Sequence, residues 1–175
     1  MKKAVTYSLF LIPLMILFSC GPKRPEAAEV QSFMEELSMR LNTTKDYYQQ
    51  FVRTLPQDGQ VVPGKVMNHV HALALKHIQE EAELIRQCKT FETDRPSKEK
   101  SEALKQAAIA IADTYLDGAT KELAEVTTIL SEENTNHSEE VKELMKAFEL
   151  RLAPVYEAYG KRQDALAKEF DITIY

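Results

Sequence analysis

Apolar residues recur at helical spacing along most of the chain. In four long segments they repeat at i, i+3, i+4 and i+7, which places one apolar stripe along one face of an α-helix. The predicted helices span about residues 28–55, 65–91, 97–130 and 138–170. The clearest break between them is residues 56–65, which hold two prolines and two glycines.

The stripe of the second segment is the set of positions that we expect to face the core there. It consists of Val66, Val70, Leu73, Ile78, Leu84, Ile85 and Cys88. Four such helices joined by short connections predict an all-α fold, an up-down-up-down four-helix bundle with its two termini at one end. A long coiled-coil hairpin is the alternative, but broad stripes favour a bundle over a narrow seam.

Prolines and the tail add local expectations. Ser97 follows Pro96 and is expected to cap the third helix. Pro154 falls inside the fourth helix, where the lost hydrogen bond and the ring clash are expected to kink or split it. Residues 171–175 are too few for more than a capping strand or an extended end.

The first residues have a different pattern. Met1, Lys2 and Lys3 precede fifteen uncharged, mostly apolar residues, 4–18. As a helix that run would cover roughly 22 Å, short of the ~30 Å hydrocarbon core of a bilayer. A basic start, a short apolar core and a small residue before the junction indicate a secretory signal peptide over residues 1–19.

The junction Leu17-Phe18-Ser19-Cys20 resembles the lipobox of bacterial lipoproteins, in which leucine lies three residues before an obligatory cysteine. The resemblance implies that the Cys20 thiol carries a diacylglycerol, that the chain is cut just before Cys20, and that the new amino group is acylated. Phe18 departs from the small residue usual at its position. Several acyl chains make such an anchor durable, because each buried methylene adds ~0.8 kcal/mol.

The same resemblance implies a domain division and an address. Residues 1–19 form the signal peptide, residues 20–27 the lipidated cysteine and a short tether, and residues 28–175 the helical domain. Gly21 replaces the aspartate that favours retention at the inner membrane, which implies the outer membrane, with the domain in the periplasm or on the cell surface. The helical part, with the ending ALAKEF-DI at 165–172, is similar only in a general way to small helical lipoproteins of unknown activity.

Charge and cysteine content narrow the possible partners. Removal of residues 1–19 takes two lysines from 22 basic residues and none from 27 acidic ones, so the remaining 156 residues carry a net charge of −7. An acidic chain without a basic stripe argues against nucleic acid, and it leaves attachment to the bilayer to the acyl chains of Cys20. Cys88 then has no partner within the chain and is expected to be a buried thiol.

Polar residues on the apolar stripes are the candidate site. His77 and Glu81 lie one turn apart on the second helix, and folding the helices back at their loops places Tyr156 and Tyr159 near the same level. A buried polar cluster that only satisfies its own hydrogen bonds is the favoured interpretation. One histidine and no second Glu-x-x-His set argue against a di-metal bundle, so we predict no metal site and no cofactor.

Other polar positions give weaker signals. Glu122 also falls on a stripe and is expected beside a lysine or at the rim. His69 and His71, two residues apart, do not share a helical face, which argues against chelation.

No catalytic motif accompanies these residues. The sequence contains no nucleophile elbow, phosphate-binding glycine loop, Cys-x-x-Cys pair or haem-attachment motif. We therefore expect a non-enzymatic, membrane-anchored envelope protein that binds another protein or has a structural role. The alternatives are a small-ligand or metal-binding bundle using His77, Glu81 and Tyr156, and an inhibitor or immunity-type lipoprotein.

Overall fold

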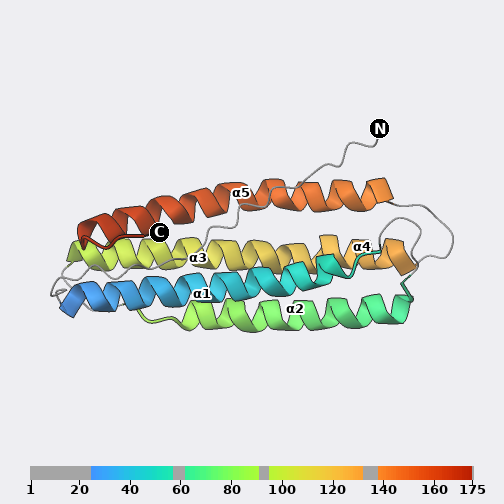
Figure 1. Ribbon diagram of the computed structural model, residues 1–175, viewed down its shortest axis with the longest axis horizontal. Helices are drawn as coiled ribbons and strands as arrows, with labels where there is room; N and C mark the ends of the chain where they lie inside the picture. The colour runs from blue at the N-terminus through green and yellow to red at the C-terminus, as the bar shows by residue number, and fades with distance from the viewer. Residues whose placement is uncertain (1–24, 57–61, 91–94, 132–137, 175) are drawn as a thin grey trace.

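The computed structural model describes residues 25–56, 62–90, 95–131 and 138–174, and over these ranges the chain is an all-α four-helix bundle without strands. The predictions for residues 1–24, the signal peptide and Cys20 among them, lie outside the described residues. The helices are α1 (Pro25–Arg53), α2 (Gly64–Gln87), α3 (Arg95–Thr120), α4 (Glu122–Ser131) and α5 (Ser138–Glu169). α3 and α4 follow one another along a single rod, so five helices make four rods (Figure 1). The predicted fold class is confirmed.

The rods alternate in direction. α1 and the α3–α4 rod run one way, α2 and α5 run the other way, and the start of α1 lies at the same end as the end of α5 (Figure 1). The cross-section is a diamond, because α1 and α3 contact each other across the centre while α2 and α5 do not approach each other. This diagonal decides which side chains can meet.

Helix starts differ from the predicted ones at two places. α1 begins at Pro25, a residue well suited to a first helical turn, so residues 25–27 of the predicted tether are helical and Ala27 is buried. α3 begins at Arg95, which places Ser97 inside the first turn and makes its predicted capping role wrong. The Ser97 hydroxyl instead donates a hydrogen bond to Glu169 of α5 (3.1 Å).

The third predicted helix is interrupted at Lys121. The Lys121 N–H donates to the Asp117 carbonyl, and the Lys121 carbonyl accepts from the Glu125 N–H, both at 2.9 Å. One turn earlier lies Gly118, against which the ring of Phe148 from α5 packs so closely that a β-carbon would lie 2.2 Å from Cε2. Glycine is needed here because no side chain fits between α3 and α5.

α5 continues without interruption through Pro154, so the predicted split does not occur. Leu150 and Pro154 are both exposed, and the Leu150 carbonyl that the ring deprives of its donor therefore lies on the face open to water. At the end of α5, Asp171 adopts a left-handed conformation (φ 53°) and the Ile172 N–H donates to the Ala167 carbonyl (2.8 Å). This is a Schellman-type end. Ile172 and Ile174 fold back onto the core as an extended end rather than a strand.

The core face of α2 agrees with the predicted stripe at Ile78, Ile85 and Cys88 and differs from it in the first half of the helix. The buried residues of α2 are Met67, Ala74, Ile78, Ala82 and Ile85. Val66 and Leu73, predicted to be buried, are 47% and 43% exposed. Each precedes a buried residue and so points about 100° away around the helix. α2 buries two alanines among three large side chains, and it leaves Val66 and Leu73 on its outer side.

None of the described helices combines the length and the apolar character that a bilayer span needs.

Candidate functional site

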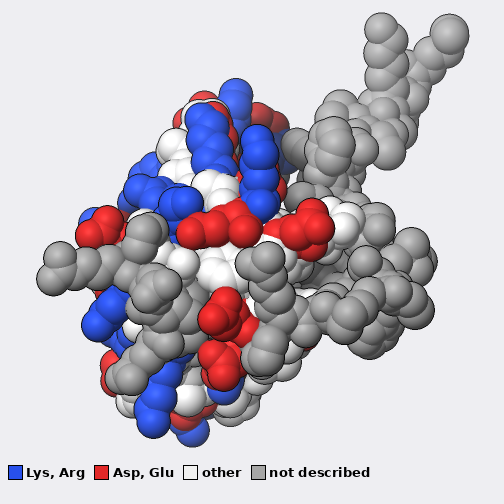
Figure 2. Space-filling view, turned by 90° about the vertical axis from the view of Figure 1, so that its left-hand side faces the viewer, with Lys and Arg blue, Asp and Glu red and all other residues white. Residues whose placement is uncertain are grey.

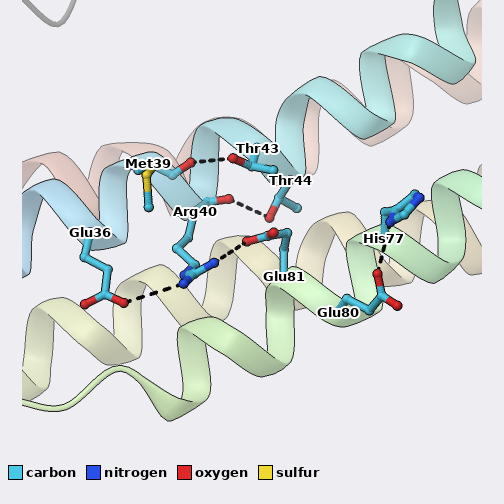
Figure 3. Close-up of polar contacts among 8 residues, drawn as sticks. All are labelled: Glu36, Met39, Arg40, Thr43, Thr44, His77, Glu80 and Glu81. Carbon is cyan, nitrogen blue, oxygen red and sulfur yellow. Dashed lines mark hydrogen bonds and ion pairs between the residues drawn. The ribbon is translucent and has the colours of Figure 1, made fainter.

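An ion-paired arginine lies on the seam between α1 and α2. Arg40 extends from α1 between Glu36 of its own helix and Glu81 of α2 (Figure 3). Its guanidinium nitrogens lie 3.8 Å from Glu36 Oε1 and 3.4 Å from Glu81 Oε2. The Glu81 side chain is only 14% exposed, and burial of its charge is tolerated because Arg40 balances it.

His77 lies one turn from Glu81, at the edge of the same seam. Its Nδ1 is 3.0 Å from Glu80 Oε2, and its ring stacks on Tyr47 of α1 with centroids 4.4 Å apart and planes 14° apart. Figure 3 shows this histidine turned towards Glu80 and not towards Glu81. His77 is half-buried, so part of its ring is exposed to solvent. The sequence predicts His77 on the apolar stripe of its helix, whereas the structure places it at the edge of that stripe.

The tyrosines form a second polar set, between α1, α3 and α5. The Tyr159 hydroxyl shares a hydrogen bond with Ser38 of α1 (3.2 Å), and the Tyr156 hydroxyl shares one with Tyr115 of α3 (3.3 Å). The Tyr48 hydroxyl donates to the sulfur of Met145 (3.7 Å). Burial raises the pKa of Tyr159 to about 12 and raises the pKa of Tyr156 as well, so these hydroxyls stay neutral.

The four residues of the predicted cluster therefore belong to two separate sets. The structure brings His77 near Glu81 on α2 and Tyr156 near Tyr159 on α5, but the helices that carry the two pairs occupy opposite corners of the diamond. Each of the four has a different partner from another part of the bundle or its own helix. Within the described ranges, no group of three or more His, Cys, Asp or Glu side chains is arranged to hold a metal ion.

A second arginine lies beside the interruption between α3 and α4. Arg151 of α5 donates to Asp117 (2.5 Å) and to Glu122, whose side chain is 13% exposed. Hydrogen bonds from Lys121 and then from Arg151 hold the pKa of Asp117 below its usual range. Glu122 was expected beside a lysine or at the rim, and its partner is this arginine. Glu122 Oε2 and the Nε atoms of Arg40 and Arg151 are buried without a partner.

The remaining candidates have structural positions. Cys88 is a buried free thiol, as predicted, and burial followed by the charge of Glu36 raises its pKa, which opposes nucleophilic reactivity. His71 Nε2 lies 2.7 Å from the Ala119 carbonyl oxygen. A carbonyl only accepts, so this nitrogen carries the proton and His71 ties α2 to the end of α3. His69 is exposed and takes no part in this contact between α2 and α3.

Two surface hollows follow single helices. One lies along α5 beside Pro154, Ala158 and Arg162, and the other along α2 beside Gln79, Glu83 and Leu84. Each is lined only by residues of its own helix, so neither enters the space between helices. These hollows do not define a chamber for a small molecule.

Sequence reasoning missed Arg40 and Arg151. Both border an apolar stripe, Arg40 next to Leu41 and Arg151 next to Leu152, and that edge position was the available signal.

Comparison of the chain with protein-family models, with curated proteins and with solved structures finds no match. The chemistry of the site therefore has to be judged from its own geometry.

Proposed function

We propose that this protein is a bacterial envelope lipoprotein anchored through Cys20, whose helical bundle acts by contacting another protein. The observation that carries the proposal is the short distance in sequence between the lipobox-like Leu17-Phe18-Ser19-Cys20 and the start of α1 at Pro25. Four residues separate Cys20 from that helix, and the five peptide units between Cys20 and Pro25 reach at most ~18 Å. An acylated Cys20 would therefore hold the bundle directly beside the bilayer.

Charge at the anchored end agrees with attachment through lipid. Figure 2 views the bundle from the end where α1 begins, and its Lys and Arg side chains are interspersed with Asp and Glu. Such a mixed surface gives little attraction to anionic headgroups, so acyl chains are the source of membrane affinity in this proposal.

The polar contacts inside the bundle support a protein-binding role for this chain rather than an enzymatic one. Glu81 and Glu122 are neutralised by Arg40 and Arg151, and the buried tyrosines bond to each other, to Ser38 or to sulfur. Groups engaged in this way hold the helices together. We infer that binding takes place on the outer surface.

Substitution of the two cysteines separately tests the anchor. Cys20→Ser should lose incorporation of a palmitate analogue and should move from the membrane pellet to the soluble fraction of fractionated envelopes. Cys88→Ala, which changes the other cysteine of the chain, should keep both label and pellet. Sedimentation of Cys20→Ser with the membranes as completely as the unaltered protein would contradict the proposal.

A further inference from the structure

α2 carries a second apolar stripe besides the one in the core. Val66, Val70, Leu73 and His77 are spaced i, i+4, i+7 and i+11, and so share one face of the helix. Val66 and Leu73 are largely exposed, Val70 and His77 are half-buried, and His77 stacks on Tyr47 of α1. We name this set, with Tyr47, the outer α2 face. Single exposed apolar residues are ordinary, but here two exposed aliphatic side chains and a half-buried one recur with helical period on one face, next to a stacked imidazole and phenol, and so form an apolar strip that a partner helix can cover.

The margin of the outer α2 face is mainly basic, and Glu80 is the acidic residue at its far end. From Gly64 to Gln79 the chain has no aspartate or glutamate, whereas Lys65, His69 and Lys76 are exposed. This stretch is basic in a protein whose overall balance is acidic. On α1, Asp46 precedes Tyr47 but points about 100° away around that helix.

The acidic residues that follow along α2 are already paired. Glu80 lies 3.0 Å from His77 and 3.8 Å from Lys76, and Glu81 pairs with Arg40 (Figure 3). No carboxylate in the described part of the chain forms an ion pair with Lys65. The outer α2 face therefore combines exposed aliphatic side chains with a basic margin. At the end of this margin near Lys65, no carboxylate of the described residues balances the positive charge.

We propose that the outer α2 face docks an acidic amphipathic helix of a partner protein. The inference rests on the proposed function and specifies its partner. Apolar residues of the incoming helix would pack between Val66 and Leu73, while its carboxylates would face Lys65 and Lys76. The start of α2 lies at the end of the bundle away from the start of α1, so the face is remote from the proposed anchor (Figure 1).

Two synthetic amphipathic peptides with the same apolar positions test this inference. One carries glutamate and the other lysine at all polar flanking positions, and binding of each to the full chain in detergent is followed by fluorescence anisotropy. The glutamate peptide should bind at least about tenfold more tightly than the lysine peptide, equivalent to ~1.4 kcal/mol. Equal binding of the two peptides, or no binding of either at millimolar concentration, would overturn the inference.

Matched substitutions locate the binding surface. Leu73→Glu and Lys76→Glu should each weaken binding of the glutamate peptide by about tenfold. Leu150→Glu and Lys161→Glu are the controls on α5, since Leu150 is 68% exposed and Lys161, like Lys76, has a glutamate four residues away. Controls that weaken binding as much as the α2 variants would refute the docking surface.

Self-association is a separate outcome of the same experiment. If the unaltered chain sediments as a dimer that Leu73→Glu dissociates, a second copy occupies the face and the proposed partner is wrong. The anchor is judged by Cys20→Ser fractionation alone, so failure of the docking inference and failure of the lipid anchor are distinguishable.

Discussion

Two glycines in long helices give opposite predictions for the same substitution. Alanine in place of glycine inside a helix gains about 1 kcal/mol from backbone entropy and propensity. At Gly160 of α5 an added β-carbon meets nothing within 4 Å, so Gly160→Ala should realise most of that gain, roughly 0.5–1 kcal/mol. The substitution adds only a methyl group in open space.

At Gly118 the same methyl group enters an occupied volume. It would lie 2.2 Å and 2.5 Å from Cε2 and Cδ2 of Phe148, whereas carbon atoms in contact are about 3.5–4 Å apart. Phe148 is 1% exposed and stacked on Tyr48, so its ring cannot move away without displacing other side chains. Overpacking of this kind costs typically about 1–3 kcal/mol, and after the propensity gain of about 1 kcal/mol Gly118→Ala should lose roughly 0–2 kcal/mol.

Urea denaturation followed by circular dichroism measures both changes on one scale. The midpoint should rise for Gly160→Ala and fall for Gly118→Ala, with the slope m unchanged. Phe148→Leu should relieve part of the cost of Gly118→Ala, giving a favourable coupling of about 1 kcal/mol in a double-mutant cycle. Equal stability of the two alanine variants, or a cycle with no coupling, would refute the close approach of α5 to α3.

Three further predictions follow from other contacts. Asp171→Gly should raise the free energy of unfolding by roughly 0.5–1 kcal/mol, since glycine adopts φ 53° without strain; a lower thermal midpoint would contradict this. Arg151→Met should cost about 1–3 kcal/mol because it leaves Glu122 unpaired, and adding Glu122→Gln should recover part of the loss in the same urea assay; absence of recovery would argue against the pair. Burial holds the pKa of Tyr159 at about 12, above the ordinary tyrosine value near 10, so between these values the folded protein retains a proton that the unfolded chain has lost. The free energy of unfolding should therefore fall as pH rises through that window, and the part of the tyrosinate absorbance that comes from the buried tyrosines should appear together with loss of helix; ionisation of all the tyrosines near pH 10 with the helix intact would contradict the burial.

The pattern of apolar residues was sufficient to predict four helical rods and their alternating directions. It was less informative about rotation of a helix about its axis. In α2, apolar residues occupy two neighbouring stripes, and the predicted set combines members of both. Ile78 and Ile85 are buried as predicted, whereas in the first half of the helix the core face is Met67 and Ala74 rather than Val66 and Leu73, where α2 packs against α1 and α3. Which face of α2 points to the core depends on the distances between the helices, and the sequence of one helix does not give those distances.

The candidate site was predictable only in part, for a related reason. Burial of Glu122 could be inferred from its position on a stripe, but its arginine partner comes from a helix about thirty residues later in the chain. The positions of the loops predict how far along the bundle axis His77 and Tyr156 lie. They do not predict which helices are neighbours in the cross-section, and α2 and α5 lie at opposite corners of it. The interruption at Lys121 lies beside tertiary contacts of Gly118 with α5 and of Ala119 with α2, which the apolar pattern along one helix does not show.

The start of α1 and the end of α5 lie at one pole of the bundle, and this has a mechanical consequence. A force applied between residues 25 and 174 would pull α1 and α5 apart from that pole, breaking side-chain contacts such as Ser38–Tyr159 in sequence rather than sliding whole helices past each other. α1 and α5 make little backbone contact with each other, so the resistance comes from the contacts of α1 with α2 and α3 and of α5 with α3, which break one helical turn after another. In single-molecule stretching the protein should therefore open like a zipper, at low force and in small steps.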